Sequence, residues 1–141
     1  PFITDEVIAV CSAQSPLAGK KLLLTDLYNL PIALREHGSG TLASLEDALA
    51  HKGFKLNDLP VKIRLGGTEA LKNFVRADVC LSFLPRPAVH KELESGELVE
   101  VPVEGLQIKR AFNFIQRKGT ENDVLQKSFI RFIKHQYSKM E

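Results

Sequence analysis

The sequence of 141 residues lacks a long apolar segment, because no run approaches the roughly 20 residues that a helix needs to cross a bilayer. It also lacks a surplus of one charge, since 19 basic and 17 acidic side chains leave a formal net charge of +2. The two signs are interspersed, so no basic stripe indicates a nucleic-acid surface. These deficits argue against a membrane protein and against DNA binding by this chain itself.

Cysteine is scarce, and the two thiols, Cys11 and Cys80, each lie inside an apolar, strand-like run. No CxxC spacing occurs, so two buried and reduced thiols are expected. Such thiols favour an intracellular compartment, and we expect a cytoplasmic protein. The chain opens at Pro1 without a methionine or a basic leader. We therefore expect a fragment or processed product with a further segment upstream.

Recognisable catalytic and cofactor motifs are also missing. The four histidines, His37, His51, His90 and His135, are scattered without metal-binding spacing, so solvated histidines are expected. No GxSxG, GxGxxG or GxxxxGKS motif occurs, which argues against that type of hydrolase and against a nucleotide site. We predict no catalytic residues, no metal and no cofactor.

What the sequence does contain is an alternation of strand-like and helix-like segments. Apolar runs and period-two alternation predict strands over residues 3–11, 32–34, 61–65, 79–84, 98–103 and 108–115. Helical spacing and caps predict helices over residues 26–30, 42–52, 69–77, 85–95 and 125–133, with Thr25 and Thr68 as caps. Such alternation favours an α/β fold with a mostly parallel sheet.

Two strands have features that place them in the sheet. The segment from Val79 to Leu84 is almost unbroken apolar sequence, as expected for a strand with helices on both faces. Pro102 cannot donate a ladder hydrogen bond, so the segment around it is expected at a sheet edge.

Two of the predicted helices begin directly after glycine-rich turns, Gly38-Ser39-Gly40-Thr41 and Gly66-Gly67-Thr68-Glu69. Helix N-termini offer unpaired N–H groups and a partial positive charge, which favour carboxylates and phosphates. In a parallel sheet both turns lie at the carboxyl edge of the strands, where open α/β folds bind ligands. The alternative is two ordinary capped turns. The charge of Glu69 could also compete with an anionic ligand.

An ordered set of segments then resembles the regulatory domain of LysR-type transcriptional regulators. The resemblance runs through Pro16–Ala18, Leu27–Ile32, Arg35–Thr41, Gly67–Lys72, Val75–Ala77, Leu84–Pro85, Ala88–Val89, Glu92–Leu93, Gly96–Val99, Arg110–Ile115 and Arg117–Lys118. It covers nearly the whole chain, although no single motif is diagnostic.

The resemblance implies a fold and a division of the chain. Members of that family carry an N-terminal winged helix-turn-helix and a two-lobed effector-binding region with the fold of type 2 periplasmic binding proteins. The chain is then expected to be mainly one Rossmann-like lobe. Residues 1–11 would be a crossover strand from the first subdomain, 12–103 the second subdomain, and 104–141 the return strand and helix. DNA would be bound only through the missing N-terminal domain.

The resemblance also implies a function, in which a small, anionic effector binds between the subdomains and alters a DNA-bound homo-oligomer, a dimer or tetramer. The implied effector-binding residues are Gly38, Ser39, Gly40, Thr41, Gly66, Gly67, Thr68, Glu69, Leu84 and Pro85. One departure concerns Asp78 and Cys80, which stand where the family usually has glycines. Asp78 can still take a left-handed turn conformation after a helix, and Cys80 adds volume near the start of the strand, so the effector pocket could be altered.

Two other classes of protein remain open on the sequence. An extracytoplasmic solute-binding protein of the same fold would require an upstream signal peptide. An enzyme on this fold, such as a dehydratase, would require a cluster of catalytic side chains, and the sequence shows no such set.

Overall fold

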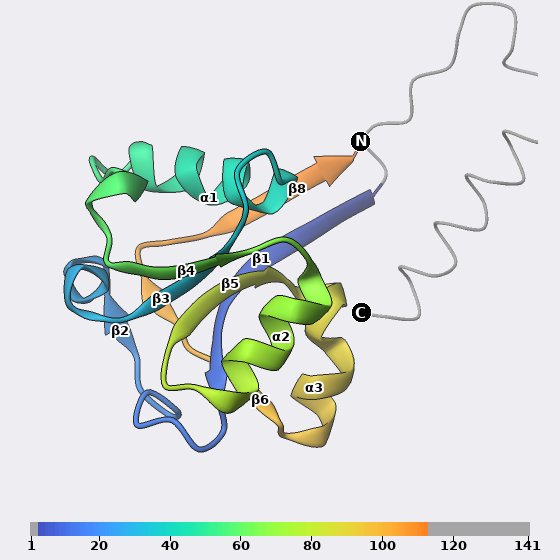
Figure 1. Cartoon of the computed structure of the whole chain (residues 1–141). Coiled ribbons are helices and arrows are strands. Elements are labelled where there is room, and N and C mark those ends of the chain that lie inside the picture. Colours follow the sequence, from blue (N-terminus) through green and yellow to red (C-terminus); the bar gives the residue numbers. More distant parts are fainter. Residues whose placement is uncertain (1–2, 113–141) are drawn as a thin grey trace, which may run out of the picture.

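The computed structural model describes residues 3–112 of the chain, and side chains from residue 5 to residue 110 (Figure 1). Its strands are β1 (Ile3–Ser12), β2 (Leu22–Leu23), β3 (Ile32–Arg35), β4 (Val61–Leu65), β5 (Leu81–Pro85), β6 (Leu98–Glu100), β7 (Val103–Glu104) and β8 (Ile108–Phe112). Its helices are α1 (Gly40–Ala50), α2 (Thr68–Ala77) and α3 (His90–Ser95), with 3-10 turns η1 (Leu24–Asn29), η2 (Leu56–Asp58) and η3 (Arg86–Val89). The helix predicted over 125–133 lies outside the described residues.

The main sheet has the order β4-β3-β5-β1-β6, and β8 also pairs with β1. Strand β3 runs parallel to β4 and β5, whereas β1 runs antiparallel to β5, β6 and β8. Since β6 and β8 both oppose β1, they share the direction of β5, and β1 is the reversed strand of a mostly parallel sheet. The predicted α/β class is confirmed, and β6 lies at an edge as Pro102 indicated.

Helices cover both faces of the sheet, as the apolar sequence of β5 predicted (Figure 1). Alternate residues of β1 point to opposite faces, so Ala9 packs in the core under α1 and Val10 in the core under α2 and α3. Helix α1 buries Leu42, Leu45 and Leu49, which recur at helical spacing. The two cores are separate layers on one sheet.

Three local predictions are wrong, each for an identifiable reason. Thr25 does not cap a helix, because η1 begins at Leu24 and the Asp26 carboxylate accepts from the Leu23 N–H at 2.8 Å. The N-cap of α2 is Gly67, and Thr68 is the first helical residue. The strand predicted over 98–103 is interrupted, since β6 ends at Glu100 and β7 joins a separate two-stranded sheet with β2. None of the helices in the described part is long and apolar enough to cross a bilayer.

Candidate functional site

The carboxyl ends of β3, β4 and β5 meet at one edge of the sheet, because these strands are parallel neighbours. The turns that precede α1 and α2 both leave from this edge, as the sequence predicted (Figure 1). Strand β1 begins here and β8 ends here, since Asp5 pairs with Arg110 across the two strands. The edge therefore gathers two helix N-termini and the ends of two further strands.

The start of α1 is closed by its own side chains. Ser39 is the N-cap, and its Oγ accepts from the N–H of Leu42 at 3.0 Å. Thr41 is buried, and its Oγ1 accepts a long hydrogen bond of 3.5 Å from Nη1 of Arg110. Gly38 has a φ of 92°, a left-handed conformation that favours glycine. The two hydroxyls therefore already accept hydrogen bonds within the protein.

A buried ion pair fixes the strands beside the α1 start. Arg110 donates through Nε to Oδ1 of Asp5 at 2.9 Å and through Nη2 to Oδ2 at 2.7 Å. Only 3% of the Asp5 side chain is exposed, and both of its carboxylate oxygens accept hydrogen bonds from Arg110. Such a two-pronged contact orients the guanidinium firmly. Arg110 thus links β1, β8 and the amino end of α1.

The start of α2 is open by comparison. Its N-cap, Gly67, has extended backbone and no side chain to offer. Among the described residues, no side chain accepts a hydrogen bond from the N–H groups of Thr68, Glu69 or Ala70. Arg35, at the end of β3, donates through Nη1 to Oγ1 of Thr68 at 3.0 Å. These free N–H groups and the guanidinium face the same corner of the edge.

Arg35 has an unsatisfied donor at this corner. Its Nε is buried and lacks a hydrogen-bond partner among the described residues. No carboxylate of the described part forms a salt bridge with Arg35 or with its neighbour Arg64, whose Nη1 donates weakly to the Arg35 carbonyl at 3.4 Å. A buried donor without a partner is unfavourable, so this arginine is suited to an acceptor from outside the chain.

Two carboxylates lie near the same corner. The Glu36 carboxylate lies 3.3 Å from where a Cβ on Gly66 would be, so glycine gives this side chain room. Glu69, in the first turn of α2, is 77% exposed in its side chain and forms a salt bridge to Lys72 at 3.1 Å. The electrostatics of the corner therefore depend on where these two acidic side chains are held.

The structure distributes the predicted site residues unevenly. The two glycine-rich turns share one edge, but the side chain of Leu84 is fully buried in the core under α2 and α3. Pro85 is half-buried and pairs with Val7 of β1. Ligand contact by any of these residues stays a prediction. Sequence reasoning missed Asp5 and Arg110, because no motif marks them and only the β1–β8 pairing brings them together.

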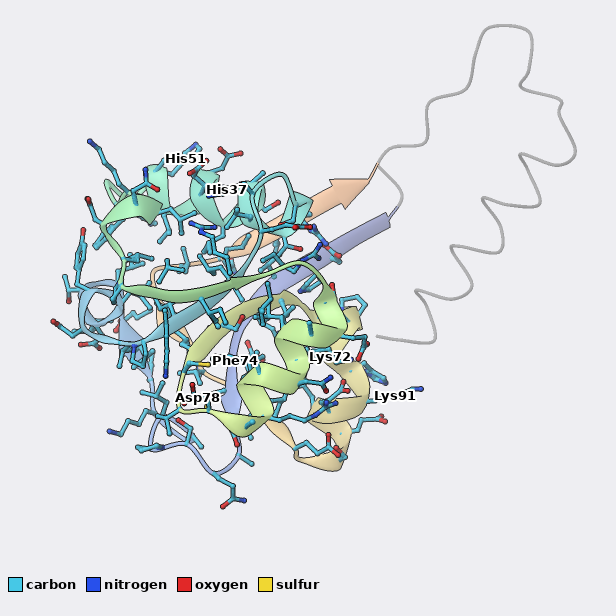
Figure 2. The ribbon with its side chains drawn as sticks, viewed as in Figure 1. His37, His51, Lys72, Phe74, Asp78 and Lys91 are labelled. Carbon is cyan, nitrogen blue, oxygen red and sulfur yellow. The ribbon has the colours of Figure 1, made fainter. Side chains whose placement is uncertain are left out.

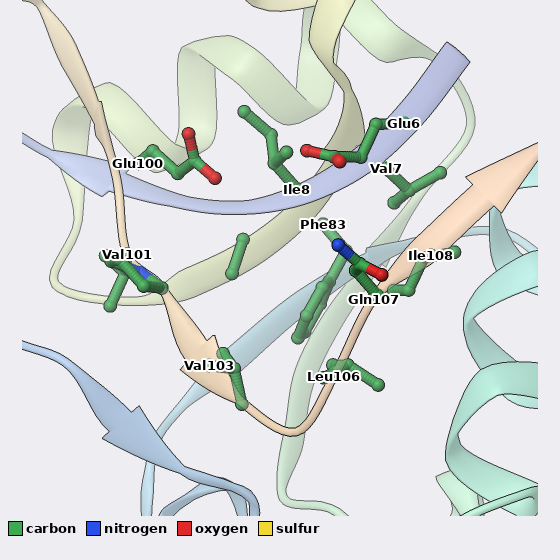
Figure 3. A pocket seen from close by; sticks show the side chains of 12 residues that line it. Glu6, Val7, Ile8, Phe83, Glu100, Val101, Val103, Leu106, Gln107 and Ile108 are labelled. Carbon is green, nitrogen blue, oxygen red and sulfur yellow. The ribbon is translucent and has the colours of Figure 1, made fainter. Parts of the chain in front are cut away.

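Two hollows lie elsewhere on the described part. One, of about 190 Å³, lies beside β1, between the part of β1 that pairs with β8 and the part that pairs with β6 (Figure 3). Its lining residues are Glu6, Val7, Ile8, Ala9, Phe83, Glu100, Val101, Pro102, Val103, Leu106, Gln107 and Ile108. The other, of about 320 Å³, lies between α1 and the segment from Gly105 to Lys109. Neither includes a residue of the two glycine-rich turns.

The residues that depart from the family pattern lie away from this edge. Asp78 ends α2 and Cys80 precedes β5, so both are at the amino end of β5 (Figure 2). Asp78 does not use the left-handed conformation that is open to aspartate, because its φ of −130° is extended. Its carboxylate accepts a hydrogen bond from Lys62 Nζ at 2.7 Å. That hydrogen bond lowers the pKa of Asp78. Burial raises the pKa of Cys80 to about 11, so this thiol is unreactive.

The expected solvation of the histidines fits their positions in the described part. His37 and His51 are exposed (Figure 2), and His90 is half-buried. No cluster of metal-binding side chains occurs within residues 3–112. His135 lies outside the described residues. Both cysteines are buried and free, as the sequence predicted.

Comparison with known proteins identifies the family. The model of the LysR substrate binding domain matches residues 1–138, and the chain belongs to this family. It is 27% identical over 133 residues to the HTH-type transcriptional activator CmpR of Synechocystis, covering 94% of this chain and 43% of CmpR. It is 29% identical over 138 residues to the HTH-type transcriptional regulator CysL of Bacillus subtilis, covering 97% of this chain and 45% of CysL.

A solved structure confirms the fold. The Synechocystis PCC6803 CcmR regulatory domain in complex with 2-PG superposes with a TM-score of 0.78 at 23% identity, covering 96% of this chain and 64% of that one. The chain thus has the periplasmic-binding-protein-like fold that the sequence predicted, which is the fold of LysR regulatory domains. The chain spans less than half the length of CmpR or CysL, and both of these are transcriptional regulators.

Proposed function

We propose that this chain is the effector-sensing part of a LysR-type transcriptional regulator and that the open edge binds one end of a small anion. The observation that carries the proposal is the buried Nε of Arg35, which lacks a partner beside the uncapped start of α2. Leaving such a donor unpaired costs about 1–3 kcal/mol, and an anionic acceptor would recover this once the groups that cover the Nε move aside on binding. The ligand named for the CcmR domain, 2-PG, is a reasonable first candidate.

The geometry of the edge suits a carboxylate or a phosphate. The free N–H groups of α2 and the planar guanidinium of Arg35 donate from two directions. Ser39 and Thr41 already accept hydrogen bonds through their oxygens, which leaves each O–H hydrogen available to a further acceptor. The two glycine-rich turns would therefore act together on one ligand group.

The whole protein would use this site to change its shape. Regulators such as CmpR and CysL extend well beyond the matched region, and DNA would be bound by a helix-turn-helix domain in that extra length. Residues 1–11 and 104–141 would belong to the first subdomain, and 12–103 to the second. Effector binding would shift subdomain closure and hence the arrangement of a cytoplasmic homo-oligomer. No catalytic step is part of this proposal.

A titration tests the proposed site. Isothermal titration of the full-length protein with 2-PG and with inorganic phosphate is expected to show saturable binding of at least one of them. The double variant Ser39→Ala/Thr41→Ala should bind that anion about tenfold more weakly, because two hydrogen bonds to a charged group are lost. Thr25→Ala, an exposed threonine at another part of the lobe, is the matched control. Equal affinity of the double variant and the control would contradict the site.

A further inference from the structure

Lys72 is a buried lysine on α2 that has no role in the anion site as proposed above. Its side chain is only 7% exposed, although lysine is rarely buried unless it is paired. Figure 2 shows it on the side of α2 that is near α3. Its Nζ donates to the carbonyl of Ala88 at 2.9 Å and forms a salt bridge to Glu92 at 3.0 Å. Two acceptors from the far side of the α2–α3 contact therefore fix this ammonium group.

The third partner of Lys72 is Glu69, which lies in the first turn of the same helix. Oε1 of Glu69 accepts from the Lys72 Nζ at 3.1 Å. An exposed pair of this spacing is usually weak. Here Ala88 and Glu92 hold the ammonium group in place, so the exposed Glu69 carboxylate pairs with a cation whose position is fixed. The contact directs that carboxylate along the helix toward α3.

A glutamate in the first turn of a helix has a competing position. The partial positive charge and the unpaired N–H groups of an N-terminus attract nearby carboxylates. At α2 no described side chain accepts from those N–H groups. Without the salt bridge to Lys72, the Glu69 carboxylate, which belongs to the first turn of the same helix, could occupy them.

We infer that Lys72 is a positioning residue of the proposed anion site, which holds the Glu69 carboxylate against α3 and keeps it away from the open start of α2. This inference rests on the proposed function, because it names a determinant of that same site. Buried Glu92 is what anchors Lys72, and Arg76 neutralises Glu92 from the other side at 2.7 Å.

The inference is tested by a double-variant cycle with inorganic phosphate as the probe. Phosphate affinity of the full-length protein is measured by isothermal titration for wild type, Lys72→Met, Glu69→Gln and Lys72→Met/Glu69→Gln. Lys72→Met is expected to weaken binding about fivefold, because the released carboxylate competes at the N-terminus. Glu69→Gln should bind at least as tightly as wild type. The double variant should recover the affinity of Glu69→Gln, since the competitor is gone.

A second pair of variants guards against loss of folding. If Lys72→Met does not give a native melting transition, Lys72→Gln/Glu92→Gln removes both charges of the buried pair and replaces Lys72→Met in the cycle. Recovery of affinity on adding Glu69→Gln to either background supports a positioning role, because a purely structural defect is not repaired by changing an exposed carboxylate.

The failures of the inference and of the proposed function are distinguishable. Equal phosphate affinity of wild type and Lys72→Met overturns the positioning role and leaves the anion site intact. Weak binding by Lys72→Met that persists in the double variant with Glu69→Gln also overturns it. Absence of phosphate binding in wild type and in Glu69→Gln overturns the positioning role, and the proposed function is overturned with it when wild type also fails to bind 2-PG.

Discussion

The two helices that start at the carboxyl edge of the sheet differ in how their first N–H groups are treated. At α1, Ser39 caps the helix and Arg110 contacts Thr41, so the start is tied to β1 and β8. At α2, the cap position is Gly67, and the first N–H groups have no side-chain acceptor within the described residues. Two turns that look alike in sequence are therefore one closed start and one open start.

The difference gives the two turns unequal tasks. A satisfied N-terminus contributes to the stability of the fold, whereas an open one retains donors for a ligand. Changes at the α1 start should therefore affect the free energy of unfolding as well as anion affinity. Changes at the α2 start should mainly affect anion affinity.

The largest effect is expected from Asp5→Asn. The change leaves the Arg110 guanidinium, which is only 17% exposed, without its carboxylate. Breaking one side of a buried ion pair should lower the free energy of unfolding by about 3 kcal/mol. Urea denaturation measures this loss, and Glu36→Gln, an exposed carboxylate at the same edge, is the control. A loss no greater than that of the control would show that the pair does not fix the α1 start.

The next effect concerns Arg35. Arg35→Met removes the guanidinium that would bind the anion, so affinity should fall by about 2 kcal/mol, or roughly thirtyfold. Lys62→Met removes an equal charge from an exposed position and should change affinity little. Isothermal titration compares both with wild type. Equal effects of the two variants would mean that only net charge matters.

A smaller effect is expected at the α1 cap. Ser39→Ala removes the acceptor for the Leu42 N–H and should lower the free energy of unfolding by about 1 kcal/mol. Urea denaturation is the measurement. Ser39→Asp, which keeps a good cap, should preserve stability. A stable Ser39→Ala protein would indicate that the α1 start is not closed in the way its geometry indicates.

The smallest effect is in the acid range and concerns Glu92, which contacts Lys72 and Arg76 of α2. Burial opposes ionisation of this carboxyl, but the hydrogen bond from Lys72 and the charges of Lys72 and Arg76 outweigh burial and lower its pKa. Its contribution to stability is therefore full above the ordinary pKa of 4.5 and is lost as pH falls through the lowered value. Glu92→Gln should remove up to about 1 kcal/mol of the stability difference between neutral and acid solution. Urea midpoints at several pH values measure it, and a slope equal to wild type would contradict this role.

The sequence was sufficient to predict the fold class and to place the two glycine-rich turns at one edge of the sheet, whereas ligand binding there stays a prediction. Apolar alternation located most elements, and parallel strands place both glycine-rich turns at one edge. It was not sufficient to tell the closed turn from the open one. Ser39 and Thr68 each stand beside glycines, but only Ser39 occupies the cap position, because α2 begins one residue earlier than its threonine suggested.

Long-range pairing explains the remaining omissions. Asp5 and Arg110 are far apart in sequence and meet only because β1 and β8 are antiparallel neighbours. The burial of Lys72 depends on where α3 packs, which helical spacing within α2 does not reveal. Asp78 and Cys80 seemed relevant from their family positions, yet the strand direction puts them at the amino end of β5.

Anion titration of Gly67→Asp in the full-length protein tests most directly whether the anion binds at the open start of α2. Gly67 has extended backbone and open space for a side chain, so aspartate can cap α2 without strain. We expect Gly67→Asp to bind the anion at least tenfold more weakly, because the new carboxylate occupies the open N–H groups of α2. The free energy of unfolding should be unchanged or higher. Asn57→Asp adds the same charge to an exposed position in η2 and should leave affinity unchanged. Wild-type affinity in Gly67→Asp would contradict the claim that the open start of α2 is where the anion binds.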